Sequence, residues 1–231
     1  MQTSFDFRQT EDLRSIRDRL SLQFGKITDK ERLDPVSQFV RSFIGSRTHD
    51  PVSWGAFARL VTRYSSWDAV ADAPVADIQA LIHDVTFPEK KAPELKAALR
   101  KIRACYGKIS FDFLVDLEIE QALSILKQIE GVGPKIAAAT LNFSTFHGRA
   151  FVVGGHVLHI LRRFGFVDAN ASAEEAYDAV MAAADDFDAD DLYELHWQLK
   201  GLGQKTCWQA QAQCFSCPLS DICLRASARA A

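Results

Sequence analysis

The chain has 231 residues, 48% of them hydrophobic, and a formal net charge of −3 at pH 7. This length supports one large or two small domains with a substantial core. Without a global positive charge, any contact with nucleic acid needs a local basic patch and backbone dipoles. No apolar run is long enough to span a bilayer, and the first residues lack the basic start and apolar core of a secretory signal. We therefore expect a cytoplasmic protein without membrane contact, in which structural disulfides do not form.

Apolar residues recur at the spacing of amphipathic helices along most of the chain. Asp34-Pro35 is expected to begin one of these helices, and Gly165 is expected to end another. No segment alternates convincingly as a strand does, so we predict an all-α fold. The predicted helices carry Leu13, Ile16 and Leu20; Phe39, Val40, Phe43 and Ile44; Trp54, Phe57 and Leu60; Leu95, Leu99 and Ile102; Ile119, Ala122, Leu123 and Leu126; residues 137–146; Val157, Ile160, Leu161 and Phe164; residues 170–189, which we expect to be exposed; and Leu192, Leu195 and Leu199.

Polar segments separate some of these helices. Residues 45–51 and 86–91 are predicted to be loops, and Asp50 or Ser53 is expected to cap the helix after the first loop. The helix around Leu99 carries the densest basic run of the chain; such a run most often forms a solvated face, and phosphate contact is the alternative. Its members are Lys96, Arg100, Lys101 and Arg103, followed by Lys108.

The segment over residues 129–135, with the sequence IEGVGPK, joins two predicted helices. Gly131 and Gly133 allow a sharp turn and the close approach of another backbone or of a phosphate. Pro134 suits the first position of the second helix, which places Lys135 in its first turn. A glycine turn that leads into a helix presents backbone N–H groups to an anion. The segment is therefore either a phosphate-binding hairpin or a tight interhelical turn without a ligand.

Four of the five cysteines lie close together near the end of the chain, with the spacing C-x6-C-x2-C-x5-C. In a reducing compartment this density indicates metal binding. Zinc sites more often use two separated C-x2-C pairs, whereas one compact loop suits a [4Fe–4S] cluster; zinc and a disulfide are the alternatives. The four residues are Cys207, Cys214, Cys217 and Cys223, while Cys105 is expected to be a small apolar residue on a helix.

Together, the glycine hairpin, the lysine after it and the cysteine loop resemble the helix-hairpin-helix DNA glycosylases, in particular the endonuclease III branch with its iron–sulfur loop. The resemblance implies a two-lobe fold: a six-helix lobe over 33–146, which contains the hairpin helices over 119–146, and a cluster lobe formed by 1–32 together with 147–231. It also implies a monomer that acts on double-stranded DNA, in the nucleoid, with the target nucleotide flipped out into a cleft. The matching segments are Asp34-Pro35-Val36, residues 44–50, residues 131–135, His156-Val157 and the cysteine loop.

The resemblance places the family's Schiff-base lysine at Lys135. A neutral amine at this position can attack C1′ of the sugar, displace the base and promote β-elimination; contact with a phosphate is the alternative role. The family's aspartate falls on Gly154, and no Asp or Glu occurs from 131 to 167. We therefore predict an N-glycosylase with AP-lyase activity through Lys135, with two alternatives: a non-catalytic lesion-binding protein, or a glycosylase that releases only the base. His156 is a candidate to replace the missing acid or base, as are Glu130 and His49.

The resemblance also predicts the residues that contact DNA. Arg47 falls where the family inserts a side chain into the gap left by the flipped base, and a planar guanidinium can stack there. The family's basic residues between the first two cysteines are absent here, and Glu130 adds a negative charge beside the hairpin, so we expect weaker DNA binding. The predicted DNA contacts are Arg47, Gly131, Val132, Gly133 and Lys205, with Arg225, Arg162 or Arg163 as further candidates.

Overall fold

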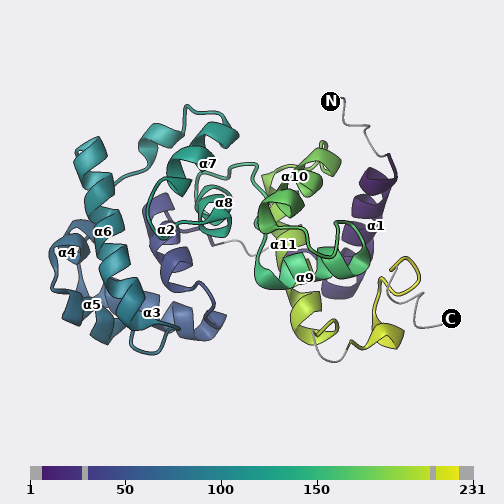
Figure 1. Cartoon of the computed structure of the whole chain (residues 1–231), viewed down its shortest axis with the longest axis horizontal. Coiled ribbons are helices and arrows are strands. Elements are labelled where there is room, and N and C mark those ends of the chain that lie inside the picture. Colours follow the sequence, from purple (N-terminus) through teal and green to yellow (C-terminus); the bar gives the residue numbers. More distant parts are fainter. Residues whose placement is uncertain (1–6, 28–30, 209–211, 224–231) are drawn as a thin grey trace. The chain divides into compact units, whose positions relative to one another are not determined.

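A computed structural model describes residues 7–27, 31–208 and 212–223 of the chain (Figure 1). Over these residues it contains α-helices, two short 3₁₀ helices and two isolated β-bridges, and no strand. The all-α fold expected from the sequence is therefore confirmed for the described part of the chain. By its internal contacts the chain divides into two compact units: a continuous unit over residues 32–148 and a discontinuous unit made of residues 1–31 and 149–231.

The continuous unit is organised around its first helix. This helix, α2, packs against α3, α6 and α8, and α6 in turn packs against α4 and α5. The two helices of the predicted hairpin, α7 and α8, also pack against each other. The helices are α2 (Pro35–Ile44), α3 (Asp50–Arg63), α4 (Trp67–Asp72), α5 (Val75–Leu81), α6 (Pro88–Tyr106), α7 (Ile119–Lys127) and α8 (Pro134–Asn142), with a 3₁₀ turn at Asp112–Leu114.

Both ends of α2 are fixed by local chemistry. Asp34 is its N-cap, as expected, and its carboxylate accepts hydrogen bonds of 3.0 Å from the N–H groups of residues 36 and 37. At the other end, a Cβ atom on Gly45 would lie 2.8 Å from the carbonyl oxygen of Arg41, so only glycine fits there without a shift. Between these ends Phe39 and Ile44 are fully buried. The helix is thereby held in register against its three neighbours.

The discontinuous unit joins the beginning of the chain to its second half. Leu13, Ile16 and Leu20 of α1 belong to one buried cluster with Leu195 and Leu199 of α11. The amino-terminal helix therefore packs on helices that follow it by more than a hundred residues. The elements of this unit are α1 (Phe7–Phe24), α9 (Gly155–Phe164), α10 (Ala173–Ala183) and α11 (Ala189–Lys205), followed by a 3₁₀ turn at Cys214–Ser216.

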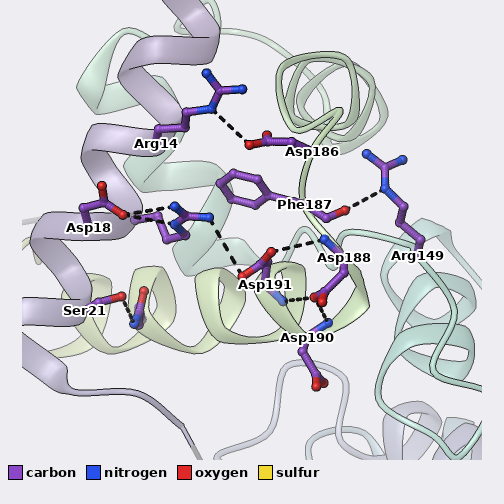
Figure 2. A network of polar contacts seen from close by, with 11 residues as sticks. Arg14, Asp18, Ser21, Arg149, Asp186, Phe187, Asp188, Asp190 and Asp191 are labelled. Atoms are coloured by element: carbon purple, nitrogen blue, oxygen red, sulfur yellow. Dashed lines mark hydrogen bonds and ion pairs between the residues drawn. The ribbon is translucent and has the colours of Figure 1, made fainter.

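A polar network surrounds the start of α11 (Figure 2). The carboxylate of Asp188 accepts bonds of 2.8 Å from two N–H groups of the first turn, and Asp191 accepts a bond of 3.2 Å from the Asp188 N–H, which completes a capping box. Arg14 of α1 donates to Asp186 at 3.2 Å, and Arg149 donates to the carbonyl oxygen of residue 187 at 2.8 Å. These contacts connect α1, the beginning of α11 and the segment that enters this unit at residue 149.

Two helices begin at residues other than those expected. The cap of α3 is His49, so neither Asp50 nor Ser53 caps it; the Ser53 hydroxyl donates instead to the Asp50 carbonyl at 2.9 Å. The predicted loop over 86–91 is wrong in its second part, because α6 already begins at Pro88. Proline suits a first helical position, and the charged residues after it form the first turn. Among them Lys91 is buried, with only 6% of its surface exposed.

Two further helices differ from the prediction in length or burial. The helix expected over 137–146 ends at Asn142, because the chain then turns away and Thr145 donates its N–H to the Leu33 carbonyl at 2.9 Å. The exposed helix expected over 170–189 is the shorter α10, which is partly buried. Alanine is small enough to pack closely in a core, so an alanine-rich composition does not imply exposure. The buried residues of α10 are Ala176, Val180 and Ala183.

The basic run of α6 makes contacts within its own unit. Arg103 forms an ion pair of 2.6 Å with Asp72 of α4, which lowers the pKa of that carboxyl group chiefly by hydrogen bonding. The other basic residues donate mostly to backbone carbonyls, so the run attaches α6 to α4 and to the end of α7. These bonds join Lys96 to Ala73, Arg100 to Ala71, Lys101 to Gln128 and Lys108 to the Asp112 carboxylate.

Candidate functional site

The turn between α7 and α8 has the hairpin geometry that the glycines predict. Gly131 has φ +81°, a left-handed conformation that favours glycine. A Cβ atom at this position would lie 2.8 Å from Cζ of Phe43, so the turn approaches α2 as closely as a glycine permits. The Val132 N–H donates to the Ile129 carbonyl at 3.0 Å, and the Val132 side chain is buried. The turn is therefore fixed both by its own backbone and by its contact with α2.

The beginning of α8 faces outward. Gly133 is the N-cap and is exposed, Pro134 occupies the first helical position, and no side chain caps the helix. Lys135 is exposed in the first turn, as expected. This arrangement presents backbone N–H groups and an amine on the same short stretch of surface, and both attract an anion.

The loop that follows α2 contains Arg47, and we refer to residues 45–48 as the Arg47 loop. Arg47 is exposed and has φ +57°, which is uncommon for a residue with a side chain. Two bonds connect this loop to the segment before α6: Thr86 donates its N–H to the Thr48 hydroxyl at 3.0 Å and its hydroxyl to the Arg47 carbonyl at 2.8 Å. The strained conformation of Arg47 is thus held by neighbours on another segment.

Phe87 is a candidate that the sequence analysis did not identify. It is the residue before α6, its side chain is 51% exposed, and its φ is +59°. Its neighbour Thr86 is hydrogen bonded to the Arg47 loop, so two exposed residues in left-handed conformations lie on two joined segments. An aromatic residue within a polar segment, directly before a proline, is the sequence signal that could have drawn attention to it.

A buried cation lies between these segments. The ammonium group of Lys91 donates to the Ile44 carbonyl at 2.8 Å, to the Ser46 carbonyl at 2.6 Å and to the Thr48 hydroxyl at 3.3 Å. Burial lowers the pKa of this amine to about 8, and the positive charges of Lys135 and Arg47 contribute to the decrease. The two exposed candidate residues of the continuous unit are therefore within electrostatic reach of one buried amine.

In the discontinuous unit, α9 begins after the sequence VVGG. Gly154 is its N-cap, with an extended conformation, and no side chain caps the helix. His156 is exposed in the first turn and lies on α11: a Cβ atom on Gly203 would be 3.0 Å from the Cβ of His156. The buried His196 of α11 has its Nδ1 2.6 Å from the carbonyl oxygen of Val152. The start of α9 is thus held against α11, and the sequence supplies no carboxylate within it.

Two other side chains proposed as substitutes for the missing carboxylate are also exposed. Glu130 lies in the turn between α7 and α8, and His49 is the N-cap of α3.

The four clustered cysteines follow α11 and are all partly exposed. Burial raises the pKa of the Cys217 thiol, and the other three thiols add to the rise, so Cys217 lies within electrostatic reach of each of them. Among the described residues, no three His, Cys, Asp or Glu side chains are arranged to hold a single metal ion. A single ion requires all donors in one coordination sphere, whereas the [4Fe–4S] cube gives each thiolate an iron of its own. The donor set is four thiols without an imidazole or carboxylate, and it fits such a cluster in number and chemistry.

Arg163 connects α9 to the cysteine loop. Its guanidinium donates to the Trp208 carbonyl at 2.7 Å and to the Cys207 sulfur at 3.6 Å, and its own carbonyl accepts from the Cys223 thiol at 3.8 Å. Arg162 donates to the Ala171 carbonyl at 2.9 Å. Both arginines thus have structural contacts here, Lys205 is exposed at the end of α11, and Arg225 lies outside the described residues.

Comparison with known proteins identifies the family. Residues 40–184 match the model of the HhH-GPD superfamily base excision DNA repair protein. Since this match covers well over half of the chain, the protein belongs to that superfamily. The fold agrees, because a solved structure of an endonuclease III–DNA covalent intermediate superposes with a TM-score of 0.79 at 19% identity, over 96% of this chain and 99% of the other.

Two relatives illustrate the range of similarity. The endonuclease III-like protein 1 of Gallus gallus is 28% identical over 78% of this chain, and the match covers 60% of that protein's own length. The endonuclease III of Sulfolobus acidocaldarius is 22% identical over 86% of this chain and 92% of its own. The chain therefore spans less than two thirds of the first relative and nearly all of the second.

In the part of the chain that the structure describes, every helix is too short or too polar to cross a bilayer.

The geometry of the hairpin predicts different effects for its two glycines. Gly131→Ala should lower the free energy of unfolding by roughly 1–3 kcal/mol, because it combines a left-handed φ with a methyl group that overlaps Phe43. Gly133→Ala is the matched control, since φ is −94° and nothing lies within 4 Å of the added atom. Its cost should stay below about 1 kcal/mol, the effect of alanine at an N-cap. Equal losses in urea unfolding would contradict this account of the turn.

Proposed function

We propose that this protein is a DNA N-glycosylase with AP-lyase activity, which acts on damaged or abasic double-stranded DNA through Lys135. The observation that carries the proposal is the position of Lys135: it is exposed in the first turn of α8, directly after a glycine turn that is fixed against α2. Membership of a base excision repair superfamily supports the same chemistry. The solved endonuclease III structure, a trapped covalent complex with DNA, also supports it.

The chemistry requires a neutral amine at Lys135. Its lone pair forms a bond to C1′ of the sugar, the bond from C1′ to the base breaks, and the base leaves with the electron pair and takes up a proton. The amine nitrogen then expels O4′ from C1′, O4′ takes up the proton that the amine gives up, and the opened sugar is left as a Schiff base. The Schiff base makes the C2′ proton acidic, and loss of this proton with departure of the 3′ phosphate breaks the strand by β-elimination. At an abasic site the base is already absent, so the amine condenses with the free aldehyde and the same elimination follows.

Other residues of the continuous unit would bind the DNA. The N–H groups at the start of α8, beside Gly131 and Gly133, suit a backbone phosphate. Arg47 and Phe87 present a guanidinium and an aromatic ring on two joined segments, and both groups stack on bases. This division of tasks, with phosphates held by backbone and bases contacted by two projecting side chains, matches the general pattern of protein–DNA contacts.

A second candidate function is favoured by one residue. Gly154 caps α9 where the family has an aspartate, so the carboxylate that stabilises the sugar cation is absent. A protein without this group could bind lesions without excising bases. It could also act only on abasic sites, where no base has to be displaced. His156, exposed in the first turn of α9, is the proposed substitute for the missing acid or base.

We further propose that Cys207, Cys214, Cys217 and Cys223 hold a [4Fe–4S] cluster. When bound, it would crosslink the segment after α11 and supply structural rigidity rather than a reaction step. Arg163 of α9 donates an N–H to the Cys207 sulfur, a contact that a thiolate ligand of the cluster would still accept. No basic residue lies between Cys207 and Cys214, so the loop offers little attraction for phosphate there.

The lyase proposal is tested by trapping. Incubation with an abasic duplex and borohydride should give a covalent adduct with the wild-type protein and none with Lys135→Ala, because only a Schiff base is reduced to a stable bond. Lys127→Ala is the matched control: this lysine is exposed on the other helix of the hairpin, and the adduct should persist. Tight binding to the abasic duplex without an adduct in the wild type would contradict the lyase and support the lesion-binding protein.

The role of position 154 is tested by restoring the carboxylate. Gly154→Asp should fold, since Asp is a favoured N-cap residue and the backbone there is already extended. If the missing carboxylate limits catalysis, the variant should release damaged bases at least about tenfold faster across a panel of damaged duplexes, which corresponds to about 1.4 kcal/mol in the barrier. Gly155→Asp, one residue further and exposed, is the control. Equal rates of base release in Gly154→Asp and the wild type would mean that the absence of this carboxylate does not limit catalysis.

The cluster proposal is tested by composition. Protein purified without oxygen should be brown and contain about four iron atoms and four sulfides per chain. Cys217→Ser should lose most of this iron, whereas Cys105→Ser should retain it, because Cys105 is exposed on α6 in the other unit. A colourless preparation with one bound zinc would exclude the cluster and leave the DNA chemistry of Lys135 to be judged separately.

A further inference from the structure

The buried ammonium of Lys91 is a charged group that the proposed chemistry does not use. It belongs to α6, only 6% of the residue is exposed, and its three donors meet three acceptors from residues 44, 46 and 48. A buried charge is costly unless it is fully hydrogen bonded. Here the contacts are complete, since an ammonium group has three N–H donors and each has a partner. An apolar side chain at this position could fill the same space but could not make these three hydrogen bonds.

The three acceptors show which segments the ammonium group holds together. The Ile44 carbonyl is at the carboxyl end of α2, where the helix dipole favours a positive charge. The Ser46 carbonyl and the Thr48 hydroxyl flank Arg47 on both sides. The Arg47 loop is therefore attached to α6 through a single side chain, immediately before and after its exposed arginine.

The same ammonium also acts on the segment that contains Phe87. The Thr48 hydroxyl accepts from Lys91 and from the Thr86 N–H, and Thr86 returns a bond to the Arg47 carbonyl. Both Arg47 and Phe87 have positive φ, which residues with side chains adopt only when their surroundings impose it. Loss of the ammonium would remove the bonds to the residues on either side of Arg47 and leave the loop attached through the bonds from Thr86.

We propose that Lys91 is a positioning residue: its protonated amine holds the Arg47 loop in the conformation that presents Arg47 and Phe87 to DNA. This inference rests on the proposed function, because it takes these two side chains as DNA contacts. It adds that the protonation state of the Lys91 amine controls how strongly the protein binds DNA. A neutral amine has two N–H donors and cannot serve three acceptors, so deprotonation releases one of the loop contacts.

The charges around Lys91 set the direction of this control. Lys135 from α8 and Arg47 from the loop oppose a third positive charge, whereas Glu94, one turn further along α6, favours it. Burial and these cations bring the pKa of Lys91 to about 8. DNA phosphates next to Arg47 would favour the protonated form. Protonation and DNA binding therefore support each other, and affinity should fall as the pH rises through about 8.

The experiment measures binding to a duplex with a tetrahydrofuran abasic analogue, and to the same duplex without it, by fluorescence anisotropy from pH 6.5 to 9.5 at constant ionic strength. In the wild type, affinity for the analogue duplex should fall several-fold across this range. Lys91→Met should bind it about tenfold more weakly at pH 7, which corresponds to about 1.4 kcal/mol, and without the step near pH 8. Lys91→Arg keeps its charge throughout, so its affinity should stay close to that of the wild type at pH 7 and lack the step.

Lys90→Met is the matched control. Lys90 is the preceding residue on α6, its side chain is 72% exposed, and it pairs with Glu94 at 3.7 Å. This variant should retain the step near pH 8 and lose less than about twofold in affinity, since exposed ion pairs contribute little. The control separates the loss of one positive charge on α6 from the loss of the buried one.

The outcomes separate this inference from the proposed function. A wild-type protein that does not prefer the analogue duplex contradicts the proposed function. The loop is then followed without DNA, by hydrogen exchange of the Thr86 amide, whose bond to Thr48 should open above pH 8 in the wild type and not in Lys91→Arg. If the wild type does prefer the analogue duplex, an unchanged affinity and pH profile in Lys91→Met overturns the inference. If Lys91→Met fails to fold, a pH step that persists in Lys91→Arg overturns it instead.

Discussion

The close approach of Gly131 to the ring of Phe43 is the constraint on which the candidate site depends. No Cβ atom fits at this point of the turn, so the hairpin is fixed against α2 near its carboxyl end. The Arg47 loop leaves α2 from the same end, and the Lys91 ammonium binds the last carbonyl of the helix. The carboxyl end of α2 therefore positions three features of the site: the turn before Lys135, the loop that carries Arg47, and the buried Lys91 amine. This amine interacts electrostatically with both Lys135 and Arg47.

This concentration of positive charge explains how a chain with a net charge of −3 can still bind a polyanion. Lys135 and Arg47 both act electrostatically on the buried Lys91, and Glu94 counteracts their effect on it. In the free protein this repulsion is unfavourable, and it is tolerated because the carbonyls at the end of α2 compensate one of the charges. A bound phosphate would relieve it. The attraction for an anion is thus determined by where the charges lie and not by their total, which is what the proposed binding of DNA requires.

The sequence predicted those features that depend on local rules. The start of α2 at Asp34-Pro35, the sharp turn at Gly131 and the end of α9 at Gly165 follow from capping and glycine preferences, and the structure confirms them. It did not predict the burial of Lys91 or the exposure of Phe87, because both reverse the usual preference of their residue type. The cause is tertiary. The Ile44 carbonyl at the end of α2 accepts a bond from the buried Lys91, and the Arg47 carbonyl accepts a bond from Thr86, the residue before Phe87. The roles of Lys135, His156 and the cysteines stay predictions.

The fold alone does not reveal whether the catalytic chemistry is intact, and Gly154 shows why. The position is the N-cap of a helix, where glycine is nearly as favourable as aspartate, typically within a few tenths of a kcal/mol. As far as the capping preference is concerned, exchange of one for the other changes the stability of α9 very little. The resemblance to the endonuclease III branch predicts a catalytic aspartate at this position, and glycine supplies no carboxylate there. Structural similarity to a glycosylase is therefore compatible with several degrees of activity, and in the proposed mechanism the activity depends on the amine of Lys135 and on the groups that set its charge.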